Sequence, residues 1–157
     1  MMRYILLLLI CTGLQQLAFA QSASDSVKQV VMDFFSAMKL SDTVGMRAVL
    51  SPTVRLEATQ SRPDAIPALI QESVTNFLSA VARTPAGALD ERIQFQSVQV
   101  DGPLASVWTP YEFYFNGRYS HCGVNSFQLV RVNDKWLIQY LIDTRRRTCA
   151  PSASPHP

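Results

Sequence analysis

The sequence has few of the residues that most often build metal and nucleotide sites. Its 157 residues include two histidines, His121 and His156, and six glycines. Neither histidine lies near cysteines at the spacing of a zinc site. The glycines are too few and too scattered for a phosphate-binding loop or a dinucleotide fingerprint, and no arrangement resembles a nucleophile triad. We therefore expect no metal ion and no cofactor.

An excess of charge of either sign is also missing. Lys and Arg number 14 and Asp and Glu number 12, which gives a formal net charge of +2. Nucleic-acid-binding domains are typically much more basic. The short run Arg145-Arg146-Arg147 is typical of a solvated strand end. Nucleic acid is therefore not an expected partner.

The first 20 residues lack an apolar run long enough for a membrane span. Arg3 gives a positive start, residues 5–10 are all apolar, and Ala18-Phe19-Ala20 has the small-x-small pattern of a cleavage site. The apolar run is too short to cross ~30 Å of hydrocarbon. We interpret residues 1–20 as a secretory signal peptide. The mature chain, from Gln21, is then expected to be periplasmic or extracellular, with no stable membrane insertion.

Two cysteines, Cys122 and Cys149, remain after removal of this peptide. An exported protein meets an oxidising environment, in which a disulfide is chemically allowed. Simple hairpin pairing places Cys122 opposite Arg145, several residues before Cys149. The chain would have to bend back to reach the Cα spacing of about 5.5 Å that a bridge needs. The sequence leaves a Cys122–Cys149 disulfide and two free thiols as open alternatives.

Helical periodicity dominates the N-terminal half. After an N-cap at Asp25 or Ser26, apolar residues spaced by three and four predict one helix with a wide apolar face. Ser41-Asp42 caps a second, shorter helix that ends at Ser51-Pro52. A weakly alternating strand is predicted from Val54 to Thr59, and a third, long helix from Pro63-Asp64 through Val81. The expected buried residues of the first helix are Val27, Val30, Val31, Phe34, Phe35 and Met38.

The C-terminal half predicts a sheet. Apolar alternation over residues 93–100 begins it, and Asp101-Gly102-Pro103 turns the chain into three long strands. Asn116-Gly117 and Asn133-Asp134 join these strands as two-residue hairpin turns, because such residues accept positive φ. The pattern predicts one α+β domain over residues 21–149, with helices on one face of a curved sheet. A disordered tail is expected over residues 150–157.

Alternation along the strands predicts which side chains line the concave face. On the last strand we take the face with Trp136 and Tyr140 as inward, because these side chains offer the largest area for burial. The turn at Asn116-Gly117 then places His121 opposite Glu112. A bulge near Pro110, which cannot donate to a ladder, would shift this count by one residue and exchange the two faces.

The predicted inward face combines large aromatic side chains with a few polar groups, which is typical of a small-molecule site. Glu112 and His121 are the candidate catalytic residues, since a carboxylate beside an imidazole forms a general acid–base pair. The alternative is a polar pair at the rim of the sheet without chemistry. The expected ligand-binding residues are Trp108, Tyr114, Asn125, Phe127 and Tyr140.

The order helix, short helix, strand, long helix and four-stranded antiparallel meander resembles the nuclear transport factor 2-like superfamily, which includes the SnoaL-like proteins. The resemblance is strongest to exported bacterial members labelled as lumazine-binding. Four segments carry it: Met46–Pro52, Leu104–Tyr114, His121–Leu129 and Trp136–Arg146. It implies a cone-shaped, cystatin-like roll with three N-terminal helices on a curved antiparallel sheet. It also implies a heteroaromatic ligand, and a homodimer formed through the outer sheet face.

Three functions are compatible with these patterns. The first is a non-catalytic binder that holds a small, partly aromatic molecule in a single pocket. The second is a small lyase or isomerase that uses Glu112 and His121. The third is a protein-interaction module of the cell envelope. In the expected homodimer, the outer face would present Val124, Val130, Leu137 and Leu141.

Overall fold

The apolar spacing of the N-terminal segment produces the predicted helix, which is described over residues 23–39 in the computed structural model of the protein. It therefore begins before the N-cap expected at Asp25 or Ser26. The chain leaves this helix at Ser41, whose φ of 58° lies in the left-handed region. Asp42 then caps α2 (Thr43–Val49) by accepting hydrogen bonds from the N–H groups of Val44 and Gly45, which confirms the predicted cap.

The structure describes residues 23–62 and 65–149. The predicted signal peptide over residues 1–20 and the predicted tail over residues 150–157 lie outside these ranges. Within them, no helix is long and apolar enough to cross a membrane.

The long helix predicted from Pro63-Asp64 through Val81 is wrong in its first half. Residues Ala65–Glu72 form strand β2, which pairs antiparallel with β1 (Leu50–Arg62), and only Val74–Ala82 form helix α3. Ser73 separates the two elements, since its side chain accepts a hydrogen bond from the N–H of Asn76 as the N-cap of α3. The edge position of β2 makes Pro67 tolerable in a strand.

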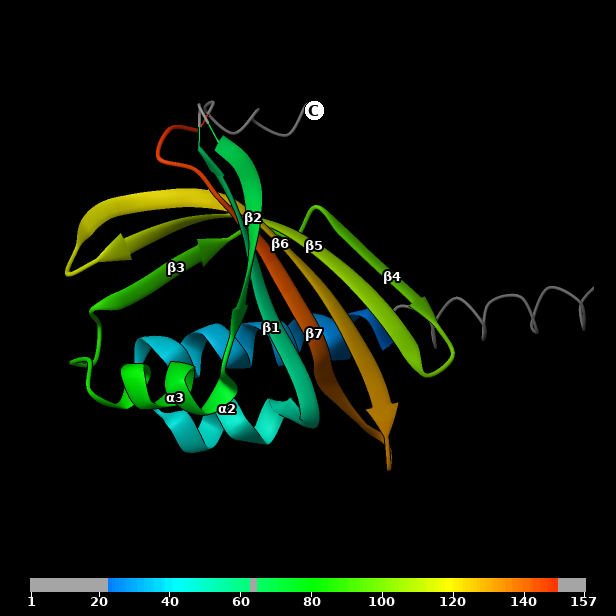
Figure 1. Cartoon of the computed structure of the whole chain (residues 1–157). Helices are drawn as coiled ribbons and strands as arrows, with labels where there is room; N and C mark the ends of the chain where they lie inside the picture. The colour runs from blue at the N-terminus through cyan, green and yellow to red at the C-terminus, as the bar shows by residue number, and fades with distance from the viewer. Residues whose placement is uncertain (1–22, 63–64, 150–157) are drawn as a thin grey trace, which may run out of the picture.

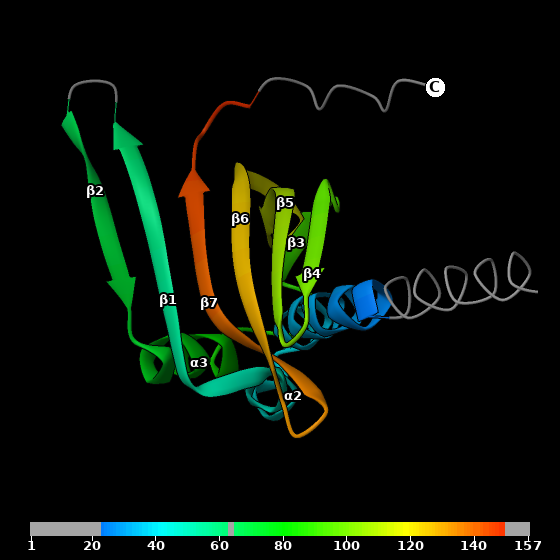
Figure 2. The same ribbon diagram turned by 90° about the vertical axis from the view of Figure 1, so that its right-hand side faces the viewer.

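The sheet has seven strands, and its order is β2-β1-β7-β6-β5-β3, with β4 also paired to β5. Figure 2 shows the strands side by side, with α2 and α3 on the side where the N-terminal helix lies. The strands not yet named are β3 (Leu89–Ile93), β4 (Ser97–Asp101), β5 (Leu104–Phe115), β6 (Arg118–Val132) and β7 (Lys135–Arg145). Because β1 and β7 run parallel, the sheet is mixed and not purely antiparallel as predicted.

Both predicted hairpin turns are present. Asn116 and Gly117 have φ values of 51° and 73° and connect β5 to β6, and Asn133 and Asp134 have values of 48° and 60° and connect β6 to β7. Two consecutive residues with positive φ match the right-handed twist of the flanking strands. The turns therefore fix the register at their end of each hairpin.

Two bulges change the register further along the hairpins. Ser120 is an extra residue in β6 between the pairs Tyr114–Tyr119 and Phe113–His121. Gln139 is an extra residue in β7 between the pairs Leu129–Ile138 and Gln128–Tyr140. Each bulge shifts the pairing by one residue, and a one-residue shift sends every following side chain to the other face.

Because of the two bulges, several side chains lie on the opposite face of the sheet from the one predicted. Trp136 and Ile138 face the helices as expected, at 7% and 0% exposure. Beyond Gln139 the inner face of β7 carries Leu141, Asp143 and Arg145 instead of Tyr140, Ile142 and Thr144. On β5 the odd-numbered residues face inward, so Trp108 and Glu112 do not. Leu141 is likewise not on the outer face, where we expected it.

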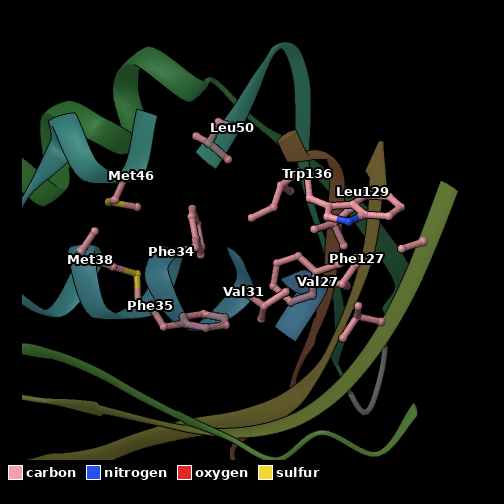
Figure 3. Packing of buried hydrophobic residues seen from close by; sticks show 14 of the residues in the cluster. Val27, Val31, Phe34, Phe35, Met38, Met46, Leu50, Phe127, Leu129 and Trp136 are labelled. Atoms are coloured by element: carbon pink, nitrogen blue, oxygen red, sulfur yellow. The ribbon is translucent and has the colours of Figure 1, made fainter. Parts of the chain in front are cut away.

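The core forms where the N-terminal helix meets the inner face of the sheet (Figure 1). Phe34 and Phe35 pack on Phe127, with ring centroids 6.5 and 5.9 Å apart. Figure 3 shows Val27 and Val31 on the same side as these rings, facing Phe127 and the strands. Met46 of α2 and Leu78 and Val81 of α3 complete the cluster.

The chain bends back after β7 and is joined to β6 by a disulfide between Cys122 and Cys149, whose Cα atoms are 6.3 Å apart. The register shift places Cys122 opposite Arg146, one residue nearer to Cys149 than predicted, and backbone hydrogen bonds of 3.0 and 2.9 Å hold this pair. Of the two alternatives for the cysteines, the structure contains the bridged one.

The two tryptophans give a test of the inner and outer faces. Trp136→Ala should lower the free energy of unfolding by about 3–5 kcal/mol, because it removes a large aromatic side chain from the core. Trp108 is 45% exposed on the other face, and Trp108→Ala should change the same quantity by less than about 1 kcal/mol. Denaturant unfolding of both variants measures the difference. Equal losses would mean that the faces have been assigned incorrectly.

Candidate functional site

A cavity of about 310 Å³ lies between the N-terminal helix, α3 and the inner face of the sheet. The helices contribute only apolar side chains to it, and the strands contribute both apolar and polar ones. A cavity of this volume with mainly apolar walls falls at the lower end of the range for small-molecule sites. Its principal apolar lining residues are Phe34, Phe35, Met38, Leu56, Phe77, Leu89, Phe113 and Leu141.

Polar side chains from four neighbouring strands also line this cavity, and we refer to them as the polar cluster. The strands are β3, β5, β6 and β7, which adjoin one another in the sheet. The members of the cluster are Glu91, Tyr111, His121, Asn125, Asp143 and Arg145. Among the described residues, no group of three or more His, Cys, Asp and Glu side chains could hold a metal ion.

Glu91 of β3 is the acid of the polar cluster whose pKa departs most from its ordinary value. Its Oε1 accepts a 2.8 Å hydrogen bond from the side-chain amide of Asn125 on β6. Burial raises the pKa of Glu91 from its ordinary value of 4.5 to about 7, and the charge of Asp143 adds to this effect, while the Asn125 hydrogen bond opposes it. No Lys, Arg or His of the described chain forms an ion pair with Glu91.

Asp143 of β7 is held by three hydrogen bonds from two strands. The hydroxyl of Tyr111 donates to Oδ2 at 3.0 Å, and also lies 3.0 Å from the Thr144 carbonyl oxygen. Arg145 donates from Nε to Oδ2 at 2.8 Å and from Nη2 to Oδ1 at 3.3 Å. The Asp143 carboxylate is therefore already paired with the Arg145 guanidinium, and Asp143 is 9% exposed.

Gly123 allows Tyr111 to reach this position. Gly123 lies opposite Tyr111 in the β5–β6 pair. A Cβ atom at Gly123 would collide with the Thr144 carbonyl oxygen and would approach Cε1 of Tyr111 to 2.9 Å. The absence of a side chain lets the tyrosine ring cross β6 toward β7. Burial raises the pKa of Tyr111 above its ordinary value, so its hydroxyl keeps its proton and remains a hydrogen-bond donor.

His121 packs its ring against aromatic neighbours in the cavity wall. Its ring centroid is 5.0 Å from that of Phe113 and 5.8 Å from that of Tyr111. Its Nδ1 lies 3.1 Å from the hydroxyl of Ser120, the bulge residue. Burial lowers the pKa of His121, and the Arg145 guanidinium lowers it further, so the neutral imidazole is favoured at pH 7.

The predicted pairing of Glu112 with His121 is wrong. His121 lies opposite Phe113, and Glu112 lies opposite Cys122. Because of the Ser120 bulge, the Glu112 side chain is on the outer face, where it accepts a 2.8 Å hydrogen bond from the Tyr114 hydroxyl. The two candidate catalytic residues therefore do not face one another, and only His121 lines the cavity.

The predicted ligand-binding residues are divided among the cavity, the core and the outer face. Asn125 lines the cavity, and Phe127 lies in the core at 0% exposure. Trp108 is exposed on the outer face, and Tyr114 lies beneath Arg92, with 4.0 Å between guanidinium carbon and ring centroid. Tyr140 lies beyond the Gln139 bulge and donates a 2.6 Å hydrogen bond to Glu57.

Sequence reasoning missed four members of the polar cluster. Glu91 is in β3, and it precedes the residues 93–100 that were expected to begin the sheet. Asp143 and Arg145 face inward because of the Gln139 bulge in β7, and Tyr111 faces inward because of the Ser120 bulge in β6, neither of which was predicted. The one available signal was a carboxylate directly after the apolar pair Leu141-Ile142, since a charge within a strand is uncommon unless it is paired.

Solved structures match this arrangement of helices and sheet, whereas no protein-family model and no curated protein matches the sequence. An NTF2-like protein of unknown function from Shewanella baltica superposes with a TM-score of 0.62 at 13% identity, over 81% of this chain and 96% of that one. An NTF-2-like protein of unknown function from Silicibacter pomeroyi gives 0.61 at 14%, over 80% and 98%. The fold is the NTF2-like fold.

A protein with a cystatin-like fold from Nostoc punctiforme is also similar, with a TM-score of 0.61 and 12% identity over 77% of this chain and 89% of that one. The NTF2-like and cystatin-like descriptions agree with the expected fold. Identities of this size show the NTF2-like fold alone, and all three proteins are described as having unknown function. The evidence for a function therefore comes from the cavity and its polar cluster.

Glu91 should make the stability of the protein depend on pH. Its pKa is higher in the folded state than in the unfolded chain, so the folded state binds the proton more tightly. This contribution to stability is complete below about pH 4.5 and is lost as the pH rises through about 7. The free energy of unfolding of the wild type relative to Glu91→Gln should fall by up to about 3 kcal/mol over that range. Urea unfolding at several pH values, with carboxyl NMR titration of Glu91, measures it. A constant difference would contradict the prediction.

Proposed function

We propose that this protein binds a small, partly aromatic molecule in the cavity between its helices and its sheet. The observation that carries the proposal is the combination of apolar walls with the polar cluster inside one cavity of about 310 Å³. Apolar walls supply affinity by burying ligand surface, and a few fixed polar groups supply orientation.

The aromatic character of the walls supports the nature of the ligand. Phe34, Phe35, Phe77, Phe113 and Tyr111 all line the cavity. Aromatic side chains favour offset or edge-to-face contact with a ligand ring, at about 0.5–1.5 kcal/mol beyond the area that they bury. A heteroaromatic ligand, as the lumazine-binding resemblance implies, is one member of this class. The lyase or isomerase alternative has less support, because Glu112 and His121 lie on opposite faces of β5 and β6.

We further propose that the protein is exported and begins at Gln21. The support is the signal-peptide pattern of residues 1–20 together with the Cys122–Cys149 disulfide, since disulfides persist in oxidising compartments. A homodimer through the outer face of the sheet is proposed with it. That face is not covered by the described helices (Figure 2) and exposes Trp108 at 45%, and exposed apolar surface of this kind marks interaction sites.

The cavity proposal predicts that Asn125→Leu weakens binding. The substitution removes a polar group that is 3% exposed and lines the cavity, and should reduce the affinity for a polar aromatic ligand by about 1–3 kcal/mol. Native mass spectrometry of protein purified from its host measures the occupancy of any co-purified small molecule. Ser126→Leu is the matched control, because Ser126 is the next residue on β6 and faces outward. Ligand retained equally by both variants would place binding outside the cavity.

The same measurement on the wild type tests export and assembly. The subunit mass should correspond to a chain that begins at Gln21, lacks two hydrogens because of the disulfide, and assembles as a dimer. A mass that includes Met1–Ala20 would contradict export. A monomer at micromolar concentration would contradict the dimer, without affecting the cavity proposal.

A further inference from the structure

The charges that line the cavity do not balance. Asp143 and Arg145 neutralise each other through two hydrogen bonds, and the Glu57 carboxylate is paired with Arg55 and accepts a hydrogen bond from Tyr140. The remaining acids are Glu91, which is bonded only to the Asn125 amide, and Glu72 of β2. The remaining base is His121, which is neutral near pH 7 because burial and Arg145 lower its pKa.

No described lining residue of the helices changes this balance. The N-terminal helix presents Phe34, Phe35 and Met38 to the cavity, and α3 presents Phe77 and Ala80. The nearest cation of the N-terminal helix, Lys39, is bonded to Asp90, the neighbour of Glu91 in β3, at 2.8 Å. An ionised Glu91 would therefore have no direct ion pair, and only the charge of Arg145, which is already bonded to Asp143, would favour it. This is an unfavourable state for a buried carboxylate.

We propose that the cavity binds a small organic cation, with its ammonium or amidinium group at Glu91 and its apolar or aromatic body against the phenylalanine walls. This inference rests on the proposed function, because it names the ligand class for the same cavity. The carboxylate of Glu91 supplies the counter-ion, and the Asn125 side chain fixes its orientation. Rings of Tyr111 and Phe113 add the attraction of an aromatic face for a cation. Glu72 adds a negative potential that favours the approach of a cation.

The opposite arrangement is a neutral ligand that receives a hydrogen bond from a protonated Glu91. The two arrangements differ in the sign of their pH dependence. A cation needs the ionised carboxylate, so its affinity should rise as the pH increases through about 7, where Glu91 loses its proton. A neutral acceptor needs the protonated acid, so its affinity should fall over the same range. Charge selectivity and pH dependence therefore test the proposal independently.

The experiment compares three probes of similar size on the full chain: 2-phenylethylamine as the cation, 2-phenylethanol as the neutral analogue and phenylacetate as the anion. Binding is measured by isothermal titration calorimetry and by NMR line shifts of the cavity residues. At pH 8 the amine, which stays protonated as lysine does, should bind at least about tenfold more tightly than the alcohol, the ratio that a single favourable charge interaction gives. Lowering the pH from 8 to 6 should weaken amine binding about tenfold.

Two matched carboxylate variants complete the design. Glu91→Gln should weaken amine binding at least about tenfold and leave alcohol binding unchanged, because it removes the charge and keeps a polar group of the same shape. Glu112→Gln should change neither, because Glu112 lies outside this cavity. If Glu91→Gln fails to fold, the pH dependence of the wild type still decides the question.

The outcomes separate this inference from the proposed function. Alcohol binding equal to amine binding, or amine affinity that does not rise with pH, would overturn the cation proposal and leave the small-molecule site standing. Binding of the amine that survives Glu91→Gln would overturn the role of Glu91. Failure of all three probes, with no molecule retained on purification, would overturn both.

Discussion

The ion pair between Asp143 and Arg145 is the one ion pair formed within the polar cluster of the described cavity. Three hydrogen bonds to the Asp143 carboxylate come from the two donors, Tyr111 and Arg145, and so connect β5 with the end of β7. Removing Arg145 would leave the Asp143 carboxylate buried and uncompensated, which is strongly unfavourable. Because Arg145 is committed to Asp143, no guanidinium is free for Glu91. Burial is the main cause of the raised pKa of Glu91, and the charge of Arg145 opposes it only in part.

The polar cluster is a local departure from what stability alone would select. A carboxyl group in an apolar cavity is disfavoured in its charged form, and a cavity forgoes the dispersion contacts that a filled core would have. The hydrophobic cluster that contains Phe34, Phe127, Leu129 and Ile138 shows no such compromise, since these side chains are apolar and at most 1% exposed. Violations of local rules confined to one place in an otherwise consistent fold are typical of binding and catalytic sites.

Sequence patterns predicted the elements whose determinants are local. The helix over residues 23–39, the Asp42 cap and both two-residue turns depend on spacing and on residues suited to positive φ. The segment Ala65–Glu72 was predicted incorrectly because its apolar residues are compatible with a helical stripe, whereas β1 offers a free edge to pair with. Tertiary pairing of this kind overrides local propensity.

The candidate site could be predicted only in part, because it depends on where the sheet changes register. Asn125 was placed correctly, since it lies on β6, whose own alternation is regular from His121 to Leu129. The positions of Asp143, Arg145 and Glu112 depend on the bulges at Gln139 and Ser120. Neither glutamine nor serine indicates a bulge in a sequence, and tertiary packing decides where the strand pairing changes register.

The Gln139 bulge also decides which side chains of β7 line the cavity, and therefore which chemical groups the cavity contains. If Gln139 were taken into the ladder and the bulge were lost, Tyr140, Ile142 and Thr144 would turn inward in place of Leu141, Asp143 and Arg145. The lining would exchange an ion pair for a phenol, an aliphatic group and a hydroxyl without any substitution. Proteins of this fold with the same residues in this strand but without the bulge would therefore differ in ligand charge preference. An alignment that ignores strand register would score such proteins as equivalent at the positions where their cavities differ most.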